Sequence, residues 1–135
     1  MPVYLTERRA TVQARLPDGR VLEGPRGATL EAFIQAAGYP PEQRVVAALM
    51  NGRLRELCFP LMEDADIAPV TTADNDGARI YRRSLSFLMI AAAAEVLPGQ
   101  IVTIHHSMPF GGYYCERGDA QRLTDEELAR LRLRM

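Results

Sequence analysis

The sequence predicts an α+β fold in two parts, and three observations lead to this class. Short windows before residue 71 alternate apolar and polar residues, which is typical of half-buried strands. After residue 77, a long apolar pattern with helical spacing begins. The polar segment between them has no apolar period and indicates a linker. Since 135 residues are few for two full domains, we expect a domain over 1–70, a linker over 71–77 and a partial domain over 78–135.

The first elements are a predicted hairpin and a helix. Residues 11–16 alternate as a half-buried strand, and the turn residues Pro17 to Arg20 allow 21–23 to return as its partner. Thr29 is a suitable N-cap for a helix that Gly38 ends. A β-hairpin followed by a helix is the first half of a β-grasp (ubiquitin-like) fold.

A second hairpin is predicted around Asn51 and Gly52. Residues 45–50 and 53–57 flank this pair, and a type I′ turn needs positive φ at both of its central positions, which Asn-Gly tolerates. Residues 67–70 are a short further strand. These strands complete the expected β-grasp sheet.

The second part begins with the longest predicted helix, from Ala78 to Leu97, which Pro98 and Gly99 end. Helical spacing gives this helix a buried stripe of Leu85, Leu88, Met89, Ala92 and Val96.

Strands are expected over 101–105 and 113–116, followed by a last helix. Thr124 and Glu127 form a predicted capping box at its start, and the helix runs to Met135. We expect a larger protein to continue beyond this residue.

Two groups of residues resemble known modules. The first is similar to a TGS domain, a β-grasp module of synthetases, GTPases and SpoT-type proteins. It comprises Asp18-Gly19, Gly27 to Leu30, Val46 to Leu54, Leu57 and Pro60-Leu61. The second follows the order of the second domain of threonyl-tRNA synthetases, and comprises Val102 to Ile104, Gly111 to Tyr114 and Leu123 to Leu128.

The stretch from Ile80 to Leu88 resembles the editing helix of those synthetases, which opens with Arg-His-Ser-x-x-His. In this chain Arg83 and Phe87 stand where that motif has histidines. Arg is permanently protonated and Phe has no lone pair, so this pair cannot share a metal or activate water. The editing reaction, a catalytic residue and a metal site are therefore not expected.

The same two modules, with the histidines replaced, resemble the N-terminus of bacterial uridine-kinase-like nucleoside kinases, and the string Arg82 to Leu88 is more similar to that family. This resemblance implies a non-catalytic regulatory or ligand-binding module joined covalently to a C-terminal kinase domain. ATP and magnesium would belong to that domain, and this chain would hold no cofactor. The alternative is a degenerate threonyl-tRNA-synthetase-like protein that acts in tRNA binding or editing.

Composition limits these functions. All 16 basic residues are Arg, so no Lys is present for a phosphate-binding loop, and a kinase site would lie beyond Met135. The net charge is −1, so we do not expect a broad surface that binds nucleic acid. Binding of tRNA is therefore not expected. Cys58 and Cys115 lie far apart in the sequence and indicate neither zinc nor a disulfide. With no signal-peptide pattern and no apolar run near ~18 residues, a cytoplasmic protein without membrane contact is expected.

The candidate binding residues are Arg79, Arg82, Arg83, Ser84, His106 and Tyr114. The three arginines are expected in the first turns of the long helix, where they could join free N–H groups in binding a small anion or a nucleotide. The alternative is pairing with Asp74, Asp76 or Glu116 on a solvated surface.

The strand residues leave similar alternatives open. His106 is either a proton carrier facing the cleft or a satisfied or exposed histidine at the end of a strand. Cys115 is either a nucleophile with His106 as its base or a packed strand residue. Tyr113 and Tyr114 alternate in direction, so one of them is expected to line the cleft.

Overall fold

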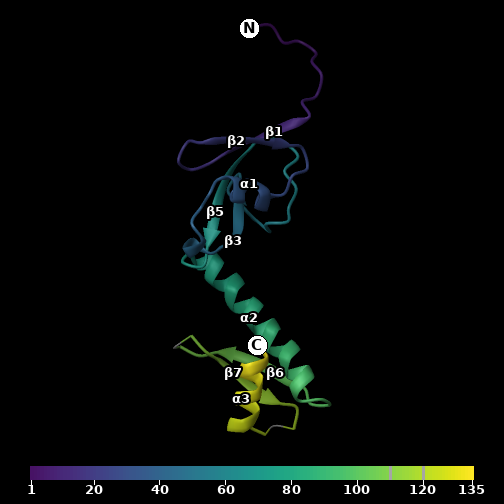
Figure 1. Cartoon of the computed structure of the whole chain (residues 1–135), viewed down its shortest axis with the longest axis vertical. Helices are drawn as coiled ribbons and strands as arrows, with labels where there is room; N and C mark the ends of the chain where they lie inside the picture. The colour runs from purple at the N-terminus through teal and green to yellow at the C-terminus, as the bar shows by residue number, and fades with distance from the viewer. Residues whose placement is uncertain (110, 120) are drawn as a thin grey trace. The chain divides into compact units, whose positions relative to one another are not determined.

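The computed structural model describes residues 1–109, 111–119 and 121–135, apart from the side chain of His106. The chain forms two compact units, Met1–Tyr81 and Arg82–Met135. Each unit combines strands with helical segments (Figure 1). The predicted α+β class is therefore confirmed.

Unit 1 is a five-stranded mixed sheet with one α-helix. Its strands lie in the order β2-β1-β5-β3-β4, with β1 and β5 parallel and the other neighbours antiparallel. Two hairpins joined through a central parallel pair and packed on one helix are a β-grasp arrangement. The elements are β1 Thr11–Arg15, β2 Val21–Pro25, α1 Leu30–Ala36, the 3-10 helix Pro41–Gln43, β3 Val45–Met50, β4 Arg53–Arg55 and β5 Ala65–Thr71.

The predicted turn at Asn51 and Gly52 is confirmed, since their φ angles are 49° and 76°. Asn51 also binds the neighbouring strand: its backbone N–H donates to the carbonyl of Asp66 at 2.8 Å, and its Oδ1 accepts from the backbone N–H of Asp66 at 2.9 Å. The hairpin is thereby fixed to β5. The strand after the turn ends at Arg55, two residues before the predicted end.

Helix α1 covers the core of unit 1. The Oγ1 of Thr29 accepts from the backbone N–H of Ala32 at 3.3 Å, so the predicted N-cap is confirmed. The core residues come from β1, α1, β3, β5 and their connections, and burying each large side chain contributes about 1.5–3 kcal/mol. They are Val12, Ala14, Leu16, Leu30, Phe33, Ile34, Ala37, Ala48, Leu61 and Ile67.

Helix α2 (Asn75–Val96) begins three residues before the predicted start. The carboxylate of Asp74 accepts from the backbone N–H of Thr71 at 2.7 Å and from its hydroxyl at 2.9 Å, which turns the chain directly from β5 into the helix. Because Thr71 ends β5 and Asn75 begins α2, only 72–74 of the predicted linker lie outside regular structure. The division between the units falls within α2, after Tyr81.

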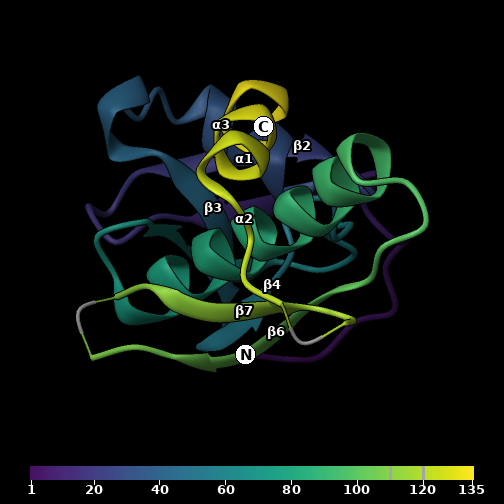
Figure 2. The same ribbon diagram turned by 90° about the horizontal axis from the view of Figure 1, so that it is seen from below.

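Unit 2 contains the antiparallel pair β6 (Val102–Ser107) and β7 (Tyr113–Arg117) together with helix α3 (Asp125–Arg134). The two strands lie side by side in Figure 2. The predicted capping box of Thr124 and Glu127 is present. The core of the unit is Ala92, Ala93, Leu97, Val102 and Leu131.

The predicted buried stripe of α2 needs a correction at its N-terminal end. Leu85 and Leu88 are 38% and 41% exposed, whereas Ala92 is buried. The core of unit 2 contacts α2 only from Met89 onward, so helical spacing alone placed the beginning of the stripe too early. This part of α2 instead presents apolar side chains to solvent.

Candidate functional site

The arginines of α2 lie further along the helix than the sequence suggested. Because α2 begins at Asn75, Arg82 and Arg83 follow about 10 to 12 Å after its first residue, at about 1.5 Å per residue. Only the first four N–H groups of a helix are free. Arg82 and Arg83 therefore lie beyond the turn that carries these free N–H groups, and an anion site that joins the arginines to them stays a prediction.

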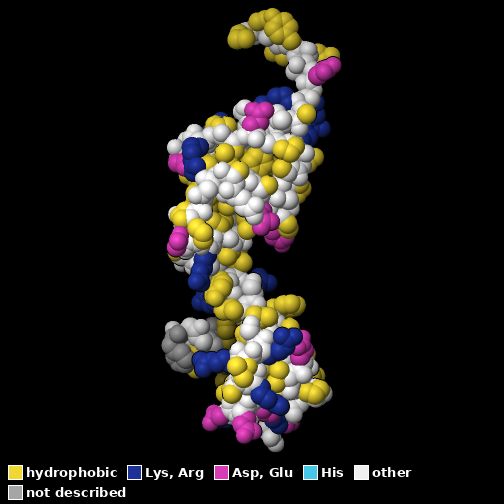
Figure 3. Space-filling model, in the orientation of Figure 1, with side chains coloured by type: hydrophobic (Ala, Val, Ile, Leu, Met, Phe, Trp, Pro, Cys, Tyr) yellow, Lys and Arg dark blue, Asp and Glu magenta, His cyan; other side chains and the backbone are white. Residues whose placement is uncertain are grey.

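Of the three arginines on α2, only Arg79 lies near a carboxylate of a described residue. Arg79 Nη1 lies 4.0 Å from Asp76 Oδ1, and both side chains are mostly exposed. Arg82 and Arg83 are exposed and form no ion pair with any described residue. Ser84 follows them and is also exposed. Arginines and apolar side chains thus share this surface, as the dark blue and yellow atoms along α2 show in Figure 3.

Arg83 and Phe87 form one face of α2, since residues four apart lie above one another on a helix. Phe87 is 76% exposed. A guanidinium and an open aromatic ring can bind phosphate and stack on a flat ligand, but neither can accept a proton from water. This face is suited to binding rather than to hydrolysis.

On the two-stranded sheet, Glu116 joins two side chains. Its Oε2 lies 3.1 Å from Nε2 of His105, and its Oε1 accepts from the hydroxyl of Tyr114 at 2.7 Å. The His105 and Tyr114 rings lie 5.9 Å apart, tilted by 47°. This hydrogen bond to Glu116 raises the pKa of Tyr114, because it favours the protonated phenol.

His105, which was not among the predicted site residues, contacts Tyr114. The backbone of His106 pairs with Tyr114 across the strands, but its side chain lies outside the described residues. A β-bulge between Ile104 and His106 shifts the pairing at this point. Because a bulge changes which side chains share a face, simple alternation could not predict the contact between His105 and Tyr114.

The two cysteines are free and differ in environment. Cys58 in unit 1 is exposed and Cys115 on β7 is half-buried. Burial raises the pKa of the Cys115 thiol, and the nucleophilic form is the thiolate. A packed residue is therefore the better interpretation of Cys115 than a nucleophile.

The described residues offer neither a cluster of metal ligands nor a membrane-spanning helix. Within 1–109, 111–119 and 121–135, no group of three or more His, Cys, Asp and Glu side chains is placed to hold a metal ion. No helix in the same ranges is both long enough and apolar enough to cross a membrane.

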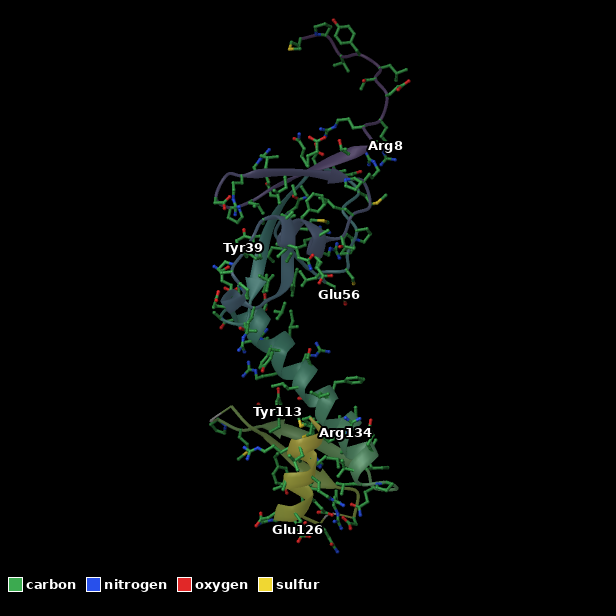
Figure 4. All side chains as sticks on the ribbon, viewed as in Figure 1. Arg8, Tyr39, Glu56, Tyr113, Glu126 and Arg134 are labelled. Atoms are coloured by element: carbon green, nitrogen blue, oxygen red, sulfur yellow. The ribbon has the colours of Figure 1, made fainter. Side chains whose placement is uncertain are left out.

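A groove of about 930 Å³ lies between β7 and α3. Figure 4 labels Tyr113 on β7 and Glu126 on α3, the two elements that form its sides. Tyr114 lines the groove, whereas Arg79, Arg82, Arg83 and Ser84 do not. The predicted cleft, which joined the helix residues to Tyr114, is therefore not this groove.

The known proteins to which this chain is similar include several threonine–tRNA ligases. No family model matches the chain. The threonine–tRNA ligase of Rubrobacter xylanophilus is 32% identical over 121 residues, which are 90% of this chain and 19% of that protein. The enzyme of Prosthecochloris aestuarii is 31% identical over 130 residues, 96% of this chain and 20% of that protein. The enzyme of Chloroherpeton thalassium is 29% identical over 124 residues, 92% of this chain and 19% of that protein.

This chain thus spans about a fifth of the length of the curated relatives that it matches. The predicted resemblance to threonyl-tRNA synthetases is confirmed, whereas these three relatives give no support to the resemblance to nucleoside kinases. Over nearly its whole length, the chain is similar to part of a threonyl-tRNA synthetase.

Proposed function

We propose that this chain is a threonyl-tRNA-synthetase-like module that contacts tRNA and does not edit it. The observation that carries the proposal is the exposed face of α2 formed by Arg83 and Phe87. Similarity to threonine–tRNA ligases over nine tenths of the chain supports tRNA as the partner.

The charges on α2 support contact with nucleic acid. Arg82 and Arg83 have no carboxylate partner among the described residues, so their guanidinium groups remain available for phosphates. A net charge of −1 gives little general attraction to nucleic acid. The proposed contact is therefore local and depends on these side chains.

The aromatic ring supplies a second kind of contact. An exposed Phe can stack on an unpaired base, and such stacking contributes about 1–3 kcal/mol per base. Phe87 lies one turn after Arg83, so a phosphate on Arg83 and a base on Phe87 could belong to neighbouring parts of one strand. Single-stranded segments of tRNA suit this surface better than its paired stems.

The absence of editing follows from the same residues. Water activation needs a metal or a base, and Arg83 and Phe87 offer neither a lone pair nor a titratable proton near neutral pH. Among the described side chains there is no metal-binding group to compensate. We therefore propose binding without hydrolysis.

Fluorescence anisotropy with a labelled threonine tRNA transcript tests the binding. Phe87→Leu and Arg83→Gln should each weaken binding about tenfold, the scale of one stacked base or one charged hydrogen bond. Arg53→Gln is the matched control, because Arg53 is an exposed arginine on β4 in the other unit. Equal binding by wild type and all three variants would refute the proposal, as would hydrolysis of the ester of a mischarged tRNA above the rate in buffer.

A second candidate is a regulatory or ligand-binding module of a nucleoside kinase, with ATP and magnesium bound by a covalently linked C-terminal domain. The string Arg82 to Leu88 favours it. The coding sequence that follows residue 135 tests it, since an in-frame phosphate-binding loop would support a kinase and its absence would count against one. Both candidates are proposed to act in the cytoplasm.

A further inference from the structure

We propose that the groove between β7 and α3 binds a small amphiphilic anion, a molecule with one acidic group on an extended apolar body. The groove lies wholly within unit 2 and shares no residue with the Arg83 and Phe87 face. The inference is therefore independent of the proposed tRNA contact.

Size and lining indicate a ligand with a large apolar part. A volume of about 930 Å³ falls within the range of roughly 300–1,000 Å³ that is usual for small-molecule sites. The walls are mostly apolar, and the side chains that form them are Met89, Leu123, Leu128, Leu131, Met135 and Tyr113. Leu128 and Met135 are 49% and 46% exposed, so the groove leaves much apolar surface for a ligand to cover.

The charged side chains that line the groove favour a negatively charged ligand. The lining includes two arginines, Arg122 and Arg132, and one acid, Asp125. Neither arginine forms an ion pair with a described residue, in contrast to Arg117 and Arg134 in the same unit, which pair with carboxylates. A groove with two available cations and one acid attracts an anion.

The groove offers few polar groups that could bind the sugar and base of a nucleotide. The hydroxyl of Tyr114 already donates to Glu116, and burial keeps the Cys115 thiol in its neutral form. The sugar hydroxyls and the base edge of a nucleotide would face aliphatic walls and lose their hydrogen bonds to water. An alkyl chain with a carboxylate leaves no polar group unpaired once Arg122 or Arg132 meets the acid.

The test uses octanoate on the full chain, measured by calorimetry and by displacement of anilinonaphthalene sulfonate. Octyltrimethylammonium has the same chain with the opposite charge, and acetate has the acid without the chain. Octanoate should bind at least about tenfold more tightly than either of them, the scale of one charged hydrogen bond or of two buried CH₂ groups.

A matched pair of variants separates this groove from other surfaces. The double variant Arg122→Gln/Arg132→Gln should weaken octanoate binding about tenfold or more, whereas Arg130→Gln, on the same helix but outside the groove, should leave it unchanged. Equal affinity for the cationic and anionic chains, equal effects of the two variants, or tighter binding of ATP than of octanoate would each overturn the proposal. Thermal unfolding of both variants checks that they remain folded.

Discussion

Arg117 donates from Nη1 to Oε1 of Glu127 at 2.8 Å, which joins β7 to the first turn of α3. Both side chains are largely shielded from solvent, at 12% and 15% exposure. Arg117 also donates to Asp119 and Gln121 in the connecting loop. The other carboxylate oxygen of Glu127 accepts from the backbone N–H of Thr124 at 2.8 Å. Strand, loop and helix cap therefore share one hydrogen-bonded network.

Replacing Arg117 should loosen unit 2. In Arg117→Gln the carboxylates of Glu127 and Asp119 lose their shared cation, and a shielded charge without its partner is unfavourable. We expect a lower thermal midpoint and faster hydrogen exchange in β7 and α3, with little change in unit 1. Arg130→Gln serves as the control, because Arg130 forms no ion pair with a described residue. Equal midpoints for the two variants would contradict the role of the network.

Stability should fall in acid because of the same carboxylates. The backbone N–H of Thr124 and then the Arg117 charge lower the pKa of Glu127, and the hydrogen bond from Arg117 lowers the pKa of Asp119. A lowered pKa contributes stability that is fully present above the ordinary values of 4.5 and 3.8, and this stability is lost as the pH falls through the folded-state values. Thermal midpoints measured from neutral pH down to about 2 should show this loss. The loss should be smaller in Glu127→Gln, and an acid limb identical to that of wild type would be the contrary result.

Gly77→Ala should strongly destabilise unit 1. A Cβ at this position would lie 1.8 Å from the backbone carbonyl oxygen of Thr71, which cannot move without shifting β5. Overpacking typically costs about 1–3 kcal/mol, and a clash with backbone belongs at the upper end of that range. Asn75→Ala is the control, in the same first turn of α2 but exposed. Urea unfolding that gives the same free energy for both variants would disprove this account of the glycine.

Residues 1–81 should fold without the rest of the chain. Every residue of the first core cluster lies between Val12 and Ile67, so the fragment retains the complete core. A dispersed NMR spectrum is the expected result. In that fragment, Leu61→Ala should cost about 2–5 kcal/mol, since Leu61 is fully buried. A collapsed spectrum would show that the core needs residues beyond Tyr81.

The purified chain should contain no stoichiometric zinc. Arg83 and Phe87 offer no ligand atoms for zinc, and the described residues hold no alternative cluster of ligands. Elemental analysis after dialysis is the measurement, with a known zinc protein as the reference. About one zinc per chain would refute both this prediction and the proposed loss of editing chemistry.

Local signals in the sequence predicted their structures well. The turn at Asn51 and Gly52 and the caps at Thr29 and Thr124 depend on a few neighbouring residues, and all of them are present in the structure. The start of α2 depends instead on Thr71 and the close approach at Gly77, which no periodic pattern reveals.

The candidate site was harder to predict than the fold. The contact between His105 and Tyr114 depends on a bulge in β6, and the groove brings together Met89, Tyr113 and Arg132 from three separate elements. Neither arrangement follows a sequence motif. Arg83 and Phe87 could be found, because helical spacing places residues four apart on one face.

Each unit carries a single cysteine, Cys58 in unit 1 and Cys115 in unit 2. The accessibility of both units can therefore be measured in one thiol-labelling reaction. Cys58 is exposed, so a thiol reagent should modify it without any opening of the fold. Cys115 is half-buried with a raised thiol pKa, so its modification should be slower. A two-phase labelling curve then gives the protection of Cys115 in unit 2 relative to Cys58 in unit 1, in the unaltered chain and without a spectroscopic probe.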